Sequence, residues 1–162
     1  MKRAVLLIFV FLFAAKSILA QKNTKTDDIR LRVLHLNHVR KTYKFNTEDN
    51  SVTYLRFLGL IHTIKGKNYK ILTSIWIWGL SQRATSRILV YTDKNEYVGN
   101  YYLTTIDDAP NYIKNNKLVF INKGNACDSK LVTYVSFDNG LPKEFFRKCK
   151  GNYGDSYTFS PD

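Results

Sequence analysis

The sequence lacks the short motifs that mark several enzyme classes. It contains no GxSxG turn, no HExxH zinc motif, no P-loop, no GxGxxG and no calcium-binding loop. Only 13 of the 162 residues are acidic, so spacing alone nominates no carboxylate pair for glycoside hydrolysis. We therefore assign no residue to catalysis, to a metal ion or to a cofactor.

Cysteine is also scarce, because Cys127 and Cys149 are the only two in the chain. Neither has a histidine or a further cysteine nearby in sequence, as a zinc site or an activated thiol would favour. Two cysteines in a small exported domain usually pair. The sequence therefore predicts a Cys127–Cys149 disulfide, with two free thiols as the alternative.

Long apolar runs are absent after residue 20, but one run of 12 residues covers 4–15. Lys2 and Arg3 precede it, and a small residue, Ala20, follows at a suitable distance. This order is typical of a cleaved secretory signal peptide. We expect residues 1–20 to be removed and the protein to be secreted or periplasmic, with no transmembrane segment after cleavage. The alternative is a membrane anchor, which needs about 20 apolar residues.

Acidic residues are outnumbered by 25 lysines and arginines, which gives a net charge of +12. Residues 1–20 carry three of these cations and no acid, so the net charge of the remaining 142 residues is +9. A strongly basic exported protein tends to meet acidic partners, such as an acidic protein or a polyanionic glycan. We do not expect nucleic acid binding, because the chain shows no groove-binding motif. The alternative is a basic surface that only aids solubility.

Most of the chain carries β-strand patterns with short connections. Residues 21–28 are polar and predict a flexible leader, whereas 29–36 alternate like a strand with a bulge. Residues 41–51 are polar and predict a loop. We expect a mainly β fold, an antiparallel β-sandwich or barrel-like sheet of about eight strands with one or two short helices. Residues 29–162 would form a single β-rich domain.

Residues 52–80 predict a hairpin around Gly66, which can supply the positive φ of a two-residue turn. That register places Phe57 opposite Trp76 and gives the hairpin one apolar face. We therefore expect Trp76 and Trp78 to lie in the core, because their face offers few polar neighbours to orient a ligand.

Two further turn signals lie nearer the C-terminus. Asp107 or Asp108 is expected to cap a short helix. Asn139-Gly140 is a strong hairpin signal, and the returning strand would place Cys149 at the open end of that hairpin.

Tyrosines cluster with lysines on a predicted hairpin between residues 87 and 105. Their residues are Tyr91, Tyr97, Tyr101 and Tyr102. We interpret them as a possible binding surface, although tyrosine also fits half-buried strands.

The sequence favours a secreted or periplasmic non-catalytic binding module for an acidic protein or glycan. The alternatives are a small secreted hydrolase of glycans or peptides and a structural envelope component.

Overall fold

The computed structural model describes residues 24–47, 50–123 and 126–162. Val33–Asp162 form one compact unit, and the described residues before Val33 do not belong to it. The signal peptide expected at 1–20 and its cleavage site lie outside the described residues. Secretion therefore stays a prediction.

A helix, α2 (Thr24–Leu36), occupies the segment where a leader and a strand were expected. The strand prediction for 29–36 is wrong, and residues 24–28 of the expected leader form the first turns of the helix. Ile29 and Val33 are spaced i, i+4, as on one face of a helix, and this period prevails over the alternation. The helix ends at Leu36, and the next residue, Asn37, has φ of 52° and donates its N–H to the Val33 carbonyl at 3.3 Å.

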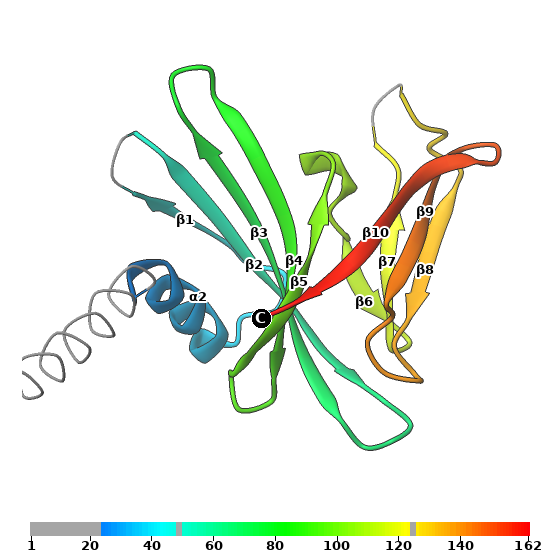
Figure 1. Cartoon of the computed structure of the whole chain (residues 1–162), viewed down its shortest axis with the longest axis horizontal. Coiled ribbons are helices and arrows are strands. Elements are labelled where there is room, and N and C mark those ends of the chain that lie inside the picture. Colours follow the sequence, from blue (N-terminus) through cyan, green and yellow to red (C-terminus); the bar gives the residue numbers. More distant parts are fainter. Residues whose placement is uncertain (1–23, 48–49, 124–125) are drawn as a thin grey trace, which may run out of the picture. The chain divides into compact units, whose positions relative to one another are not determined.

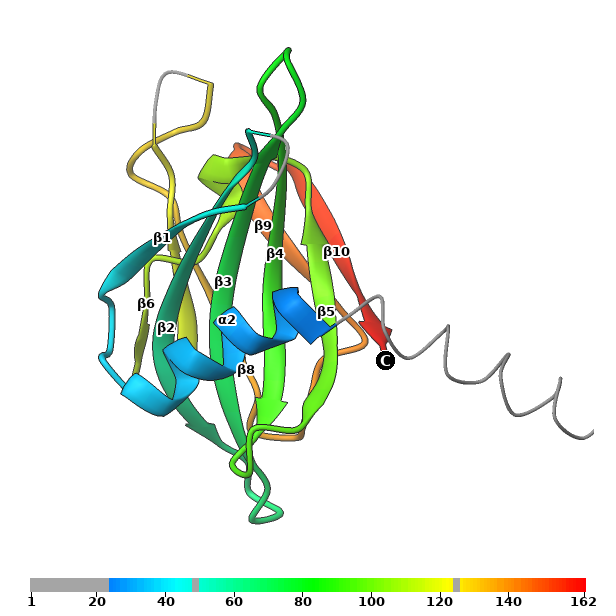
Figure 2. The same ribbon diagram turned by 90° about the vertical axis from the view of Figure 1, so that its left-hand side faces the viewer.

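The rest of the described chain is built mainly from antiparallel strands (Figures 1 and 2). In chain order the strands are β1 (Thr42–Asn46), β2 (Val52–His62), β3 (Asn68–Trp78), β4 (Arg83–Thr92), β5 (Tyr97–Leu103), β6 (Tyr112–Lys114), β7 (Lys117–Ile121), β8 (Val132–Ser136), β9 (Glu144–Lys150) and β10 (Tyr153–Pro161). A single 3-10 turn, η1 (Ile106–Asp108), lies between β5 and β6 among the described residues.

The strands form two sheets. The larger has the order β1-β2-β3-β4-β5-β10-β9, and the smaller has the order β6-β7-β8. This confirms the expected mainly β, sandwich-like fold, and the described strands do not close into a barrel. The loop expected over 41–51 is wrong, because β1 lies there and pairs with β2 along the edge of the larger sheet.

The main core lies between the two sheets. Ile71, Ile88 and Tyr101 of the larger sheet cluster with Leu118 and Phe120 of the smaller one, and all five are at most 1% exposed. Burial of such side chains contributes about 1.5–3 kcal/mol each. The alternate residues of the larger sheet consequently point to its opposite face.

The β2–β3 hairpin forms as predicted, but its register differs. Phe57 lies opposite Leu72 and not Trp76. The turn holds three residues, with Gly66 at φ of 76°, because the Thr63 N–H bonds to the Lys67 carbonyl at 2.9 Å. A bulge between Phe57 and Gly59 shifts the register by one more residue. Trp76 and Trp78 still share a face of the sheet with Phe57. In the observed register, however, Trp76 lies opposite Thr53, near the start of β2.

The Asn139-Gly140 turn joins the two sheets and does not close a hairpin. It connects β8 of the smaller sheet to β9, the edge strand of the larger one. Phe137, fully buried just before the turn, fixes the end of β8 in the core between the sheets. The hairpin prediction is therefore wrong at this position.

The Cys127–Cys149 disulfide is present, as predicted, with 4.5 Å between the Cα atoms. It does not close a hairpin as expected. Cys127 lies in the connection between β7 and β8, whereas Cys149 lies on β9. The bond therefore ties a loop of the smaller sheet to the edge strand of the larger sheet.

Candidate functional site

The four tyrosines expected to form a binding surface do not lie together. Tyr101 is fully buried, and its hydroxyl donates to the Pro142 carbonyl at 2.7 Å, while burial raises its pKa. Tyr91 is 3% exposed and contacts the half-buried Tyr97, with 5.3 Å between ring centroids. Only Tyr102, at 56% exposure, is widely open to a partner. Tyr91 and Tyr101 are thus buried, and Tyr101 belongs to the main core. Tyr102 points to the other face because successive strand residues alternate.

Tyr102 belongs to a different exposed surface, which the cross-strand register assembles. Trp78 lies opposite Arg83, and Trp76 opposite Thr85. Arg87, two residues beyond Thr85 on β4, lies opposite Tyr102 on β5. All six side chains share the face of the sheet that points away from the main core. We call this set the basic aromatic surface: Trp76, Trp78, Arg83, Thr85, Arg87 and Tyr102.

The two tryptophans are not the core residues that the sequence predicted. Trp76 is 43% exposed, and Trp78 is partly exposed. Their rings stack with 5.5 Å between centroids and 24° between planes. The Arg83 guanidinium lies 5.7 Å from the Trp78 ring centroid, within cation–π range. The Trp78 Nε1–H donates to the Thr85 hydroxyl at 3.3 Å. These contacts hold the exposed rings in one arrangement.

The second arginine of the surface repeats this pairing. The Arg87 guanidinium lies 5.7 Å from the centroid of the Tyr102 ring. Stacking on a ring leaves the in-plane N–H groups of a guanidinium able to bind a carboxylate. Within residues 24–47, 50–123 and 126–162, no carboxylate forms an ion pair with Arg83 or Arg87. The surface therefore carries two positive charges with no internal counter-ion.

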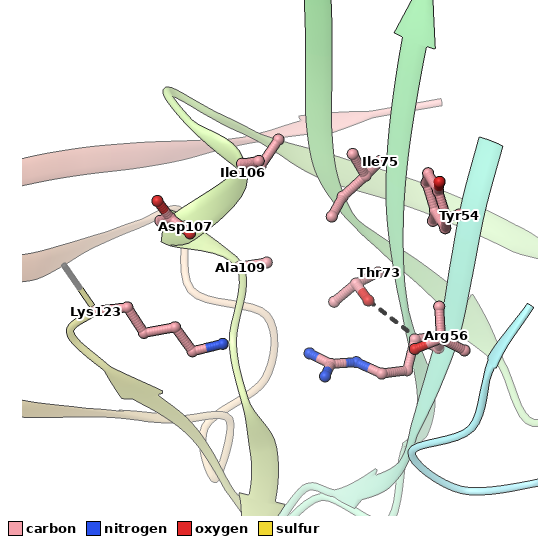
Figure 3. A pocket seen from close by; sticks show the side chains of 9 residues that line it. Tyr54, Arg56, Thr73, Ile75, Ile106, Asp107, Ala109 and Lys123 are labelled. Carbon is pink, nitrogen blue, oxygen red and sulfur yellow. Dashed lines mark hydrogen bonds between the residues drawn. The ribbon is translucent and has the colours of Figure 1, made fainter. Parts of the chain in front are cut away.

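A pocket of about 230 Å³ lies on the other face of the larger sheet, between β2, β3 and the η1 segment (Figure 3). Arg56 on β2 and Lys123, two residues after β7, extend into it from opposite sides. The Arg56 Nη2 donates to the Pro110 carbonyl at 2.7 Å, and burial lowers the pKa of this guanidinium. Asp107 is the third charged residue that lines the pocket.

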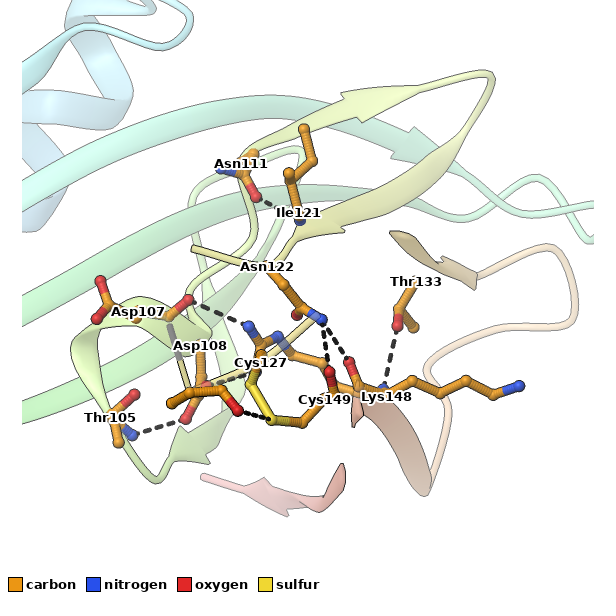
Figure 4. A network of polar contacts seen from close by, with 12 residues as sticks. Thr105, Asp107, Asp108, Asn111, Ile121, Asn122, Cys127, Thr133, Lys148 and Cys149 are labelled. Atoms are coloured by element: carbon orange, nitrogen blue, oxygen red, sulfur yellow. Dashed lines mark hydrogen bonds and ion pairs between the residues drawn. A yellow bond between two sulfur atoms is a disulfide. The ribbon is translucent and has the colours of Figure 1, made fainter. Parts of the chain in front are cut away.

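A buried polar network lies beside this pocket (Figure 4). Arg147 on β9 is 2% exposed, and its Nη1 donates to the Asp108 carboxylate at 2.6 Å. The other oxygen of that carboxylate accepts the Thr105 N–H at 2.8 Å. The expected capping role is wrong in position, because Thr105 is the N-cap of η1, and Asp107 and Asp108 lie inside this turn and not before a helix. Burial raises the pKa of the neighbouring Tyr157, and the Asp108 carboxylate raises it further. The ion pair therefore joins η1 to the edge of the larger sheet.

Asn122 makes a second link between the sheets. Its side-chain amide donates to the carbonyls of Asp128, Lys148 and Cys149 at 3.0–3.2 Å. Sequence reasoning found neither Asn122 nor Arg147. The only available signal for Arg147 was its alternation with Phe145 on an apolar face, which predicts an inward-pointing charge.

Comparison of the chain with protein-family models, curated proteins and solved structures found no match. Among the residues that the structure describes, no three histidine, cysteine, aspartate or glutamate side chains gather as a metal site would require. No helix in the described part of the chain combines the length and the apolar character needed to cross a membrane.

Proposed function

We propose that this protein is a secreted, non-catalytic binding module whose basic aromatic surface binds an acidic protein. The observation that carries the proposal is the set of stacked rings and arginines on one sheet face, in which Trp76, Arg83 and Tyr102 are exposed and Trp78 and Arg87 are half-buried. Trp76 and Tyr102 are 43% and 56% exposed, and Arg83 and Arg87 stack on neighbouring rings. Tryptophan, tyrosine and arginine dominate the residues that carry binding energy at protein interfaces.

The ring contacts favour a protein over a glycan. A sugar-binding platform presents open ring faces, but here each aromatic ring already contacts another side chain. Trp76 stacks on Trp78, and Tyr102 lies under Arg87. Ring edges carry partial positive charge, and the exposed Arg83 guanidinium offers N–H donors. Ring edges and guanidinium N–H groups can contact the carboxylates of a partner protein whose surface also carries apolar side chains.

The net charge and the disulfide also support a secreted protein that binds an acidic partner. The net charge of +9 after residues 1–20 would steer an acidic partner towards the protein. The Cys127–Cys149 disulfide is typical of proteins in oxidising compartments, as expected for a secreted chain.

Binding is favoured over hydrolysis. The pocket beside η1 is lined by one carboxylate, that of Asp107. Glycosidic hydrolysis generally uses two carboxyl groups about 5–9.5 Å apart. The basic aromatic surface is an open sheet face and carries no carboxylate.

A peptide selection tests the proposal. A library of random displayed peptides is selected on the wild-type domain and counter-selected on the Arg83→Gln/Arg87→Gln variant. We expect enriched peptides to contain several Asp or Glu residues together with apolar ones. They should bind the wild type and lose affinity for the Trp76→Ala variant.

The matched control is Lys65→Gln/Lys67→Gln, which removes two exposed charges from the β2–β3 turn and lowers the net charge equally. Selected peptides should bind this variant as they bind the wild type. If both double variants lost the same amount of peptide affinity, the total charge of the protein, and not this surface, would drive binding. Binding of heparin but of no acidic peptide would replace the protein partner with a sulfated glycan.

A further inference from the structure

A second site emerges from the charges that converge in the pocket beside η1. Arg56 and Lys123 point towards each other across the pocket (Figure 3). In the described part of the chain neither cation forms an ion pair, although Asp107 also lines the pocket. Two like charges directed into one partly enclosed space repel each other, and an anion between them would turn the repulsion into attraction.

The Arg56 guanidinium is held in place for such a ligand. Its Nη2 donates to the Pro110 carbonyl at 2.7 Å, which fixes the plane of the fork. Burial lowers the pKa of Arg56, so the charged form is destabilised in the absence of a counter-ion. The remaining N–H groups of a fixed guanidinium match the two oxygens of a carboxylate.

The size and the walls of the pocket limit the ligand further. Its volume of about 230 Å³ lies below the roughly 300–1,000 Å³ of pockets that hold drug-sized molecules. Ile75, Ile106 and Ala109 form apolar walls beside the two cations. A small molecule with one charged end and a short hydrocarbon body matches this combination.

The pocket wall is rigidly supported. Ile106 and Asp107 line the pocket, and the next residue, Asp108, is anchored to Arg147 in the buried ion pair. The Arg147 Nη2 also lies 3.5 Å from the Asp107 carbonyl oxygen, to which it donates. These contacts preorganise the wall, which lowers the entropic cost of binding.

We infer that the pocket lined by Arg56, Lys123 and Ile106 binds a small organic carboxylate. This site is separate from the basic aromatic surface, because Arg56 and Trp76 lie on opposite faces of the larger sheet. The β2–β3 register pairs Arg56 with Thr73 on one face and Thr53 with Trp76 on the other. The inference therefore does not depend on the proposed protein partner.

The test is a titration of the isotope-labelled protein with sodium butyrate, followed by the backbone amide resonances in NMR spectra. We expect saturable shifts at Arg56, Thr73 and Ile75. Butyramide, a neutral molecule of the same shape, should cause no saturable shift. Equal binding of butyramide would overturn the inference, because the two cations would then contribute nothing.

Two variants and a second anion complete the test. Lys123→Gln should weaken butyrate binding about tenfold, as expected for loss of a charged hydrogen-bond donor. Lys114→Gln, an exposed lysine on β6 outside the pocket, removes the same charge and should leave affinity unchanged. An equal effect of both variants would refute the site. Inorganic phosphate that bound as tightly as butyrate would refute a role for the apolar walls.

Discussion

Replacement of Arg147 by methionine should strongly destabilise the protein. The Arg147 and Asp108 side chains are 2% and 7% exposed, and their charged atoms lie 2.6 Å apart. Methionine has a similar length but no charge, so Asp108 would remain buried without its partner. Breaking a buried ion pair on one side costs about 3–5 kcal/mol. Domains of this size have a total free energy of unfolding of about 5–15 kcal/mol, so this loss would remove a large fraction of the stability.

The assay is urea unfolding followed by tryptophan fluorescence, with thermal unfolding as a second readout. A loss of 3–5 kcal/mol should lower the melting temperature by about 10 °C or more. The double variant Arg147→Met/Asp108→Asn should be more stable than Arg147→Met alone, because it leaves no unpaired buried charge. Asparagine also retains an oxygen for the Thr105 N–H. A loss below about 1 kcal/mol for Arg147→Met, as measured for exposed pairs, would refute the buried pair.

Three further results are expected. Replacement of Cys127 and Cys149 by serine should lower the free energy of unfolding by about 3 kcal/mol, because the bond closes a loop with a sequence separation of 22; equal urea midpoints for oxidised and serine forms would contradict this. Trp76→Ala should cost only about 1 kcal/mol, the worth of a ring stack, because the side chain is 43% exposed; a loss of 3–5 kcal/mol would restore the core assignment. Mass analysis of the exported protein should find Gln21 at the N-terminus, and an intact Met1 would point to an anchor.

The sequence predicted the β2–β3 hairpin because alternation and a turn glycine are local signals. Its register could not be predicted in the same way. The bulge before Gly59 places Leu58, which is 2% exposed, in the core between the sheets, so the smaller sheet helps to set the register. The helix at Thr24–Leu36 was missed because Ile29, Leu31 and Val33 fit a period of two, although Ile29 and Val33 also share a helical face.

The candidate site was predicted only in its charge and residue types. Tryptophan is usually well buried, but Trp76 lies near the end of β3, where the register leaves it exposed. Tyr101 and Tyr102 are adjacent in sequence, and the sheet sends one into the core and the other to solvent. Arg147 and Asp108 are 39 residues apart, and no local pattern joins them.

The most direct test of the basic aromatic surface is a salt series of peptide affinity, measured by fluorescence anisotropy with one selected acidic peptide. Arg83→Gln/Arg87→Gln should weaken binding at least tenfold at about 0.1 M salt, as loss of two interface arginines would. Lys65→Gln/Lys67→Gln should change it by less than about threefold. Wild-type affinity should fall as the Debye length shortens from about 10 to about 3 Å between 0.1 and 1 M salt. An affinity that is independent of salt and equal in both double variants would contradict an acidic partner at this surface.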